Sequence, residues 1–316
     1  MSFDQEKYQI PEFQSTYMGF DTSFSWLRGN HHGYSTTSDG EDDPLKILQS
    51  YENEGYQYIA FSEHDILQNP SELTPHTSMC ILPAVEVTSR FKQTLLFLGA
   101  DRVLPKETLT PLEIMHEADT PESLFIFNHP NWQPWPDYAT DDLLDTMIGL
   151  RGIEIYTGVI RRLKGNPNAW DRLLSKGWRI FGHATDDQHC ADDQFIAWNC
   201  VQWPLGKPVT TAGIIEALVD GRFYASTEVL INHVGTTDDQ RAVRVESDAK
   251  AIRWITQNGV VVKEDKTGTS TLTAEEFTRT MNPSASSTSM FYYLRAECLG
   301  DNDEFAWTQP FWLRHD

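Results

Sequence analysis

The feature that most constrains the fold of this chain is an alternation of short apolar runs with amphipathic segments. Runs such as YQYIAFS at 56–62 and WRIFGHA at 178–184 have the length and composition of buried strands. Amphipathic segments lie between such runs, and Pro44 and Gly177 mark a helix start and a helix end. Strands that alternate with helices predict a mostly parallel sheet covered by helices, and the six or seven repeats favour a closed α/β barrel.

The rhythm changes near residue 230. From about Asn232 onward, strand-like runs follow one another without long helices, and residues 267–289 are rich in Thr and Ser. This pattern is typical of a small antiparallel β-sandwich. We therefore predict two domains, an α/β barrel over residues 1–230 and a β-sandwich over residues 231–316.

The charge balance excludes several classes of partner. Lys and Arg total 25 against 46 Asp and Glu, a net charge of −21. A chain this acidic repels polyanions, so we expect it to bind neither nucleic acid nor an anionic membrane, and no obligate protein partner is evident. No apolar run approaches the roughly 20 residues that span a bilayer, and no signal peptide is visible, so we expect a cytoplasmic location.

Side chains of the kinds that bind metals follow strand-like runs at five places. The five groups are Asn30-His31-His32-Gly33-Tyr34-Ser35 with Ser38-Asp39-Gly40, Ser62-Glu63-His64-Asp65, Ala84-Val85-Glu86, Asn128-His129-Pro130 and Thr185-Asp186-Asp187-Gln188-His189. Any one of them could be a packed histidine, a helix cap or a turn. In parallel α/β barrels the carboxyl ends of the strands meet at one mouth, so the five groups would converge there.

The residue types in these groups fit a metal centre. Imidazole and carboxylate together suit zinc, manganese or iron(II). A carboxylate such as Glu86 can bridge two ions about 3.5–4 Å apart, as in two-metal hydrolytic sites. Asp187 and His189, two positions apart at a strand end, can both point into one mouth.

The order of these motifs resembles that of the polymerase and histidinol phosphatase (PHP) superfamily. The matching motifs run Asn-x-His-x-x-Ser with Ser-Asp-Gly, Ser-Glu-His, Ala-x-Glu, His-Pro and Asp-x-His, over roughly residues 25–230. The resemblance implies a distorted seven-stranded (β/α) barrel with two or three divalent transition metal ions (Zn, Mn or Fe). The tail, with GRFYAST and YLRAECLGDNDEFAWTQPFWL, resembles the β-sandwich that follows some PHP barrels.

Matched position by position, the resemblance implies the metal ligands. They are His32, Tyr34, Asp39, His64, Glu86, His129, Asp187 and His189, with Glu154 as a weaker candidate. Tyr34 stands where the family has the second histidine of His-x-His. It could coordinate as phenolate, a water could replace the lost imidazole, or one metal position could be weak. His31 precedes His32 in an extended segment and should point to the opposite face, in a structural or supporting role.

We therefore expect a metal-dependent phosphoesterase acting on a small phosphate ester, with His64, Glu86, Asp187 and His189 as its catalytic residues. His64 or His189 could protonate the leaving oxygen. The candidates for substrate binding are Arg90, Arg161, Arg162 and Trp132, accompanied by Lys164 and Trp135. Two alternatives stay open: a PHP-like hydrolase of C–O or C–N bonds, and a non-catalytic barrel that binds metal or ligand.

Overall fold

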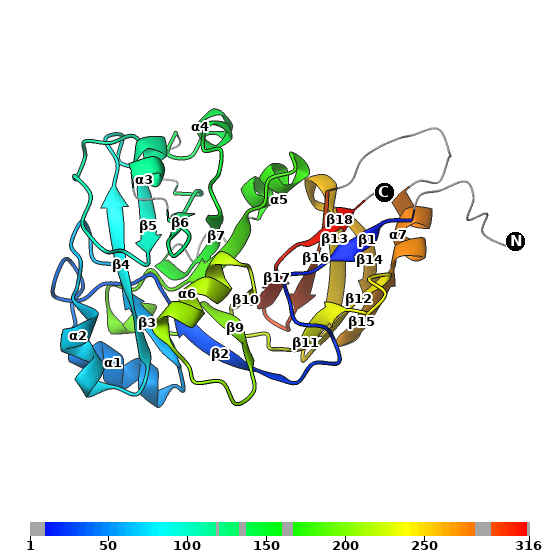
Figure 1. Ribbon diagram of the computed structural model, residues 1–316, viewed down its shortest axis with the longest axis horizontal. Coiled ribbons are helices and arrows are strands. Elements are labelled where there is room, and N and C mark those ends of the chain that lie inside the picture. Colours follow the sequence, from blue (N-terminus) through cyan, green and yellow to red (C-terminus); the bar gives the residue numbers. More distant parts are fainter. Residues whose placement is uncertain (1–9, 118–119, 133–136, 160–166, 282–291, 315–316) are drawn as a thin grey trace, which may run out of the picture. The chain divides into compact units, whose positions relative to one another are not determined.

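The computed structural model describes residues 10–117, 120–132, 137–159, 167–281 and 292–314 (Figure 1). It divides into two compact units. The larger unit comprises Phe24–Trp170 and Arg179–Ala225, and the smaller comprises the described residues up to Ser23, Asp171–Trp178 and those from Ser226 onward. The expected mixed α/β architecture with a separate small antiparallel sheet is confirmed.

The larger unit is built on one mostly parallel sheet with the strand order β10-β9-β2-β3-β4-β5-β6-β7-β8. Its strands are β2 (Phe24–Asn30), β3 (Tyr58–Phe61), β4 (Cys80–Thr88), β5 (Thr94–Leu98), β6 (Leu124–Phe127), β7 (Gly152–Thr157), β8 (Phe181–Thr185), β9 (Trp198–Pro204) and β10 (Phe223–Ser226). The pairs β2–β3, β3–β4, β6–β7 and β7–β8 are parallel. β5 is antiparallel to both neighbours, because the turn at 89–93 is too short for a crossover.

The side chain of Asn199 links β9 to β8, so the sheet closes back on itself at this point. The amide of Asn199 in β9 donates to the carbonyl oxygen of Ala184 in β8 over 2.7 Å and accepts from the Ala184 N–H over 3.2 Å. These two hydrogen bonds take the place of backbone pairing between β8 and β9, which lie far apart in the strand order. The carboxyl ends of the parallel strands are thereby gathered around one mouth.

Polar side chains cap two helices of the larger unit, and the first of these begins at Pro44 as expected. The side chain of Asp43 caps α1 by accepting from Leu45 N over 2.9 Å, and Gly55 follows with a φ of +77°. Thr210 caps α6 in the same way, over 3.2 Å to Gly213 N. The helices are α1 (Pro44–Asn53), α2 (Pro70–Leu73), α3 (Pro111–Glu117), α4 (Asp141–Thr146) and α6 (Thr211–Val219), with short 3₁₀ turns η2 (Thr74–His76) and η4 (Ala191–Asp193). A further helix, α5 (Asn168–Ser175), begins in the larger unit and belongs to the smaller unit from Asp171 onward.

The smaller unit contains two groups of antiparallel strands. One is a three-stranded sheet of β11 (Ile231–Thr236), β12 (Ala242–Ser247) and β15 (Thr269–Thr273). The other consists of β1 (Glu12–Gln14), β13 (Ala251–Thr256), β14 (Val260–Asp265), β16 (Tyr293–Leu299), β17 (Phe305–Thr308) and β18 (Phe311–Arg314). The buried Trp254 in β13 donates its indole N–H to Ser270 in β15 over 2.7 Å, so the two groups face each other. The unit also holds α7 (Ala274–Met281) and η5 (Gln257–Gly259).

The division differs from the predicted one, because three stretches of the predicted barrel domain belong to the smaller unit: the described residues up to Ser23, Asp171–Trp178 and residues 226–230. β1 pairs with β18, with Phe13 opposite Leu313. The carboxylate of Asp171 accepts from Arg295 Nε over 2.8 Å and from Nη2 over 2.7 Å, and both side chains are buried. Asp171 and Arg295 lie 124 residues apart, so no local sequence pattern could predict that they pair.

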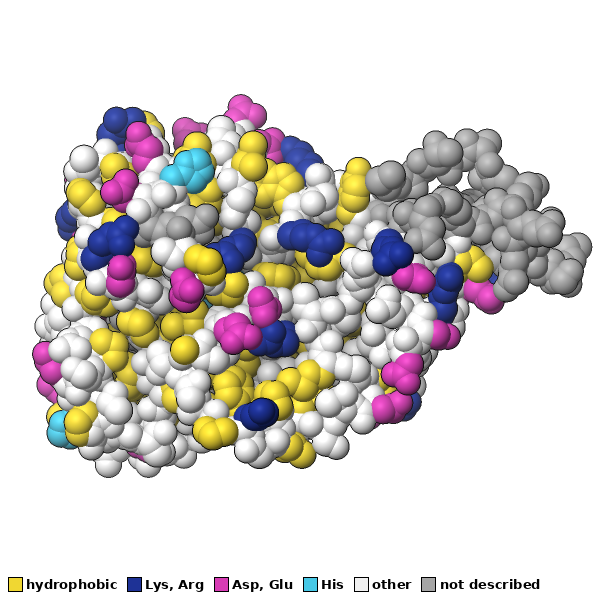
Figure 2. All heavy atoms as spheres, in the orientation of Figure 1, with side chains coloured by type: hydrophobic (Ala, Val, Ile, Leu, Met, Phe, Trp, Pro, Cys, Tyr) yellow, Lys and Arg dark blue, Asp and Glu magenta, His cyan; other side chains and the backbone are white. Residues whose placement is uncertain are grey.

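In the view of Figure 2, acidic and basic side chains of the described residues are interspersed, and no continuous basic area is visible. None of the described helices is long and apolar enough to cross a membrane.

Candidate metal centre

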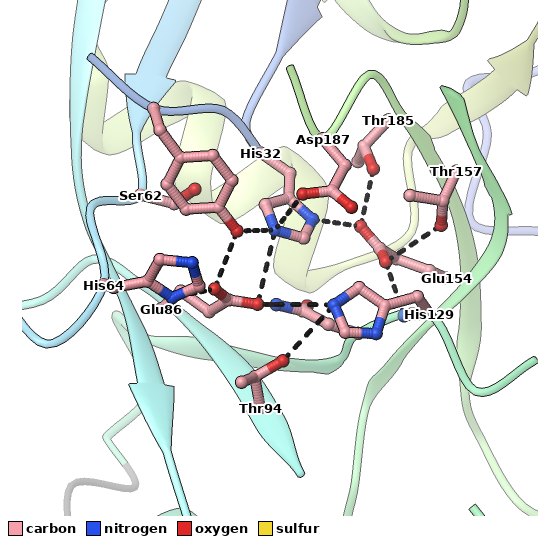
Figure 3. Close-up of polar contacts among 12 residues, drawn as sticks. His32, Ser62, His64, Glu86, Thr94, His129, Glu154, Thr157, Thr185 and Asp187 are labelled. Carbon is pink, nitrogen blue, oxygen red and sulfur yellow. Dashed lines mark hydrogen bonds and ion pairs between the residues drawn. The ribbon is translucent and has the colours of Figure 1, made fainter. Parts of the chain in front are cut away.

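The mouth of the larger unit gathers the expected ligands from five strand ends (Figure 3). His32 and Tyr34 follow β2, His64 follows β3, and Glu86 lies near the end of β4. His129 follows β6, and Asp187 and His189 follow β8. Two triads of potential ligands result, and in each the ligand atoms lie within 4.8 Å of one another.

The first triad, which we call the buried triad, consists of His32, His129 and Asp187. His32 Nε2 lies 3.3 Å from Asp187 Oδ1. Glu86 Oε1 lies 3.4 Å from His32 Nε2 and 3.5 Å from His129 Nε2. His129 and Asp187 have positive φ values of 29° and 54°, conformations that non-glycine residues seldom adopt and that recur at functional sites.

Glu154 in β7 supports the buried triad from behind. Its Oε1 accepts from His32 Nδ1 over 2.6 Å, and its Oε2 accepts from His129 N over 2.6 Å. Thr185 and Thr157 donate to the same carboxylate over 2.5 and 3.2 Å. Glu154, the weaker candidate ligand, therefore belongs to neither triad and instead keeps the proton of His32 on Nδ1, which leaves Nε2 facing the site.

The charges around Glu154 keep it ionised. Burial alone would raise its pKa, but the charge of His32 and the hydrogen bonds from His32 and Thr185 lower it to about 2. Glu86 behaves similarly: burial opposes ionisation, and hydrogen bonds from His129, His32 and His64 hold its pKa well below the usual range.

The second triad, which we call the mouth triad, consists of Asp39, His64 and His189 and is more exposed. Asp39 Oδ2 lies 3.4 Å from His64 Nε2 and 3.7 Å from His189 Nε2. His64 Nδ1 is bound to Glu86 Oε2 over 2.6 Å, and His189 Nδ1 donates to the carbonyl oxygen of Asp187 over 2.9 Å. Both imidazoles thus turn Nε2 toward one carboxylate, an arrangement that suits a divalent cation.

The neighbouring carboxylates raise the pKa of His64. Burial alone would lower its pKa, but the hydrogen bond and charge of Glu86, with the charge of Asp39, raise it to about 9. Without a cation, His64 is therefore protonated at neutral pH, and a metal ion binding at Nε2 must displace that proton.

Tyr34 lies at the junction of the two triads and is 1% exposed. Its hydroxyl lies 2.7 Å from His32 Nε2 and donates to Glu86 Oε2 over 2.7 Å. Its ring lies against those of His64 and His189, with centroid distances of 4.6 and 4.4 Å. Burial and the charges of Glu86 and Asp187 raise the pKa of the phenol well above its ordinary value.

Three residues near the ligands have structural roles. The carboxylate of Asp186 accepts from three successive backbone N–H groups at 195–197, as well as from Asn30 and Tyr51. Glu63 accepts from the backbone and hydroxyl of Ser35 over 3.0 and 2.5 Å. His31 is fully buried and packs edge-to-face on His183, with ring centroids 5.1 Å apart.

The substrate-binding candidates have separate outcomes. Arg161, Arg162, Lys164 and Trp135 lie outside the described residues. Trp132 packs beside the buried triad, with its ring centroid 5.0 Å from that of His129. Arg90 lies in the turn between β4 and β5, with its guanidinium 4.8 Å from the ring centroid of Phe91.

The sequence did not predict the roles of the polar side chains that hold the ligands. Asn128 donates to Glu86 Oε1 over 2.7 Å, and Thr94 Oγ1 lies 3.4 Å from His129 Nε2. Thr185 and Thr157 hold Glu154. A signal did exist for Asn128 and Thr185, because each lies within two positions of a predicted ligand at a strand end.

Comparison with known proteins supports the fold. No protein-family model matches the chain, and no curated protein does. Among solved structures, the chain resembles a two-domain protein from Bacteroides vulgatus, described as containing a predicted PHP-like metal-dependent phosphoesterase. The TM-score is 0.50 and the identity 16%, over 95% of this chain and 90% of that one.

A weaker match is PsfC from Pseudomonas syringae, at 12% identity and a TM-score of 0.43 over 60% of this chain and 87% of that one, too low to support an inference. The first likeness spans both units, and it confirms the expected resemblance to PHP-like proteins at the level of the fold.

Proposed function

We propose that the protein is a metal-dependent hydrolase of the PHP type, a phosphoesterase that acts on small phosphate esters. The observation that carries this proposal is the pair of His/Asp triads at the mouth of the larger unit. In each triad, at least one imidazole has its Nδ1 bound to an oxygen and its Nε2 turned toward a carboxylate. The fold of the Bacteroides vulgatus protein, which its description links to metal-dependent phosphoesterases, supports the same proposal.

The residues of the centre have two kinds of role, metal binding and support of the metal ligands. His32, His129 and Asp187 hold one divalent ion, and Asp39, His64 and His189 hold another. Bound transition metal ions of this kind neutralise phosphate oxygens and lower the pKa of water toward about 7. Glu154 keeps His32 in the tautomer that presents Nε2, and Glu86 does the same for His64.

The mouth triad is the part of the centre that a small substrate can reach. The side chains of His64, His189 and Asp39 are 32%, 35% and 51% exposed. Trp132 beside His129 offers an apolar wall for an organic group on the phosphate.

The test is hydrolysis by protein that has been stripped with chelator and reloaded with Zn²⁺, Mn²⁺ or Fe²⁺. The substrates are p-nitrophenyl phosphate and bis(p-nitrophenyl) phosphate, with a lactone and an amide alongside to test C–O and C–N bonds. We expect metal-restored phosphatase activity. Asp187→Asn should lower kcat/KM by at least about 100-fold, because it removes a charged ligand of the buried triad.

The matched control is Asp192→Asn, which removes a carboxylate from an exposed position five residues away. It should leave kcat/KM within about twofold of the wild type. Metal-loaded, folded protein that hydrolyses none of these substrates would instead favour a non-catalytic binding barrel. Activity confined to the lactone or the amide would refute the phosphoesterase assignment.

A further inference from the structure

We infer that Glu86 serves the buried triad alone and that the centre holds two separate single-ion sites, because Tyr34 and His64 together occupy the second carboxylate oxygen of Glu86. The inference rests on the proposed metal-dependent function and concerns how the two triads share Glu86. A carboxylate that bridges two ions must offer one oxygen to each. The question is therefore which lone pairs of Glu86 remain available.

The Oε2 atom of Glu86 is already occupied. It accepts from His64 Nδ1 over 2.6 Å and from the hydroxyl of Tyr34 over 2.7 Å. A carboxylate oxygen has two lone-pair positions, so these two donors fill it. Oε1 accepts from Asn128 over 2.7 Å, and its second position faces His32 Nε2 and His129 Nε2 at 3.4 and 3.5 Å, the ring nitrogens that would bind an ion of the buried triad. Glu86 can thus serve an ion in the buried triad but has no free position for a second.

The bond between Glu86 and His64 is compatible with a loaded mouth triad. His64 uses Nδ1 for Glu86, and its Nε2 is the atom that faces Asp39. Histidine ligands of metal ions ordinarily donate their other ring N–H to a carboxylate, which orients the ring. An ion in the mouth triad therefore preserves this hydrogen bond, and Glu86 acts there as a supporting partner and not as a ligand.

The position of Tyr34 prevents the phenol from moving aside. The side chain is 1% exposed, and its ring packs against both His64 and His189 of the mouth triad. Its hydroxyl reaches down to His32 of the buried triad, 2.7 Å from Nε2. The aromatic ring thus borders one triad while its hydroxyl meets the other, and swinging out would break packing contacts and the hydrogen bond to Glu86.

The experiment measures metal stoichiometry and coupling in addition to activity. Stripped protein is titrated with Mn²⁺ by calorimetry, and the loaded protein is examined by low-temperature electron paramagnetic resonance. We expect two ions per chain, without the multiline spectrum of an exchange-coupled pair. His189→Ala should remove one ion and change the Kd of the other by less than about threefold, because independent sites do not share ligands. His129→Ala should do the converse.

Two variants test how Tyr34 affects the number and coupling of the bound ions. Tyr34→His replaces the phenol by a potential ligand and should add a third ion or a coupled pair. Tyr34→Phe keeps the ring and adds no ligand, so it should still bind two ions. A multiline spectrum in the wild type, loss of both ions in His189→Ala, or an unchanged stoichiometry and spectrum in folded Tyr34→His overturns the inference alone. Absence of any Mn²⁺ binding overturns the proposed function and this inference together.

Discussion

Replacing Glu154 by Gln should weaken the buried site selectively. The carboxylate accepts hydrogen bonds from His32, His129, Thr157 and Thr185, all of them from buried or nearly buried partners. Glutamine is nearly isosteric, but one of its two acceptor oxygens becomes an N–H donor. Either His32 Nδ1–H then faces another donor, or His32 takes the tautomer whose Nε2 carries the proton and cannot bind a metal. Loss of such a supporting carboxylate typically lowers metal affinity about 10- to 100-fold, or roughly 1.4 to 2.7 kcal/mol.

The assay is calorimetric titration of Mn²⁺ or Zn²⁺ into stripped Glu154→Gln protein. The mouth triad, which does not touch Glu154, should bind as in the wild type, so only one of the two affinities should fall. Thr157→Val is the matched control, because it removes only the longest hydrogen bond to the same carboxylate, at 3.2 Å. It should change either affinity by less than about threefold. Folded Glu154→Gln protein with both affinities unchanged would refute this role for Glu154.

The remaining predictions concern pH and stability. Burial lowers the pKa of His31 to about 3, so the unfolded chain binds this proton below about pH 6.5 while the folded protein does not. Urea unfolding is therefore measured for the metal-free wild type and for His31→Leu at pH 8 and pH 5. The free energy of unfolding of His31→Leu minus that of the wild type should be about 2 kcal/mol larger at pH 5 than at pH 8. The same difference at both pH values would contradict this expectation. Because the pKa of His64 is raised to about 9, protons compete with metal at the mouth triad, and the calorimetric Kd there should fall about tenfold from pH 7 to pH 8; a pH-independent Kd would argue against this site. Asp171→Ala removes the carboxylate that accepts two short hydrogen bonds from the buried Arg295 and leaves the longer ion pair with Glu297 at 3.7 Å. It should destabilise the smaller unit by about 3–5 kcal/mol in scanning calorimetry, against little effect from the exposed Asp301→Ala; equal effects would refute it.

Local pattern determined much of the larger unit. The apolar runs around Tyr58–Phe61 and Phe181–Thr185 form strands, and a helix begins at Pro44 as predicted. The strand-end ligands could also be predicted, because the carboxyl ends of parallel strands meet whatever the details of the sheet. The local pattern did not reveal β9 as a strand, nor that β5 and β9 run antiparallel to the strands β4 and β2 with which they pair.

What the sequence could not determine is how the polar groups of the centre pair with one another. His32 and Glu154 are 122 positions apart, and nothing in either segment says that this glutamate orients that imidazole. The same holds for Glu86 and Tyr34, 52 positions apart, whose hydrogen bond occupies one oxygen of the carboxylate. Strand periodicity places side chains on a face, but hydrogen-bond partners at a barrel mouth depend on the register and curvature of every strand between them, which only the folded sheet establishes.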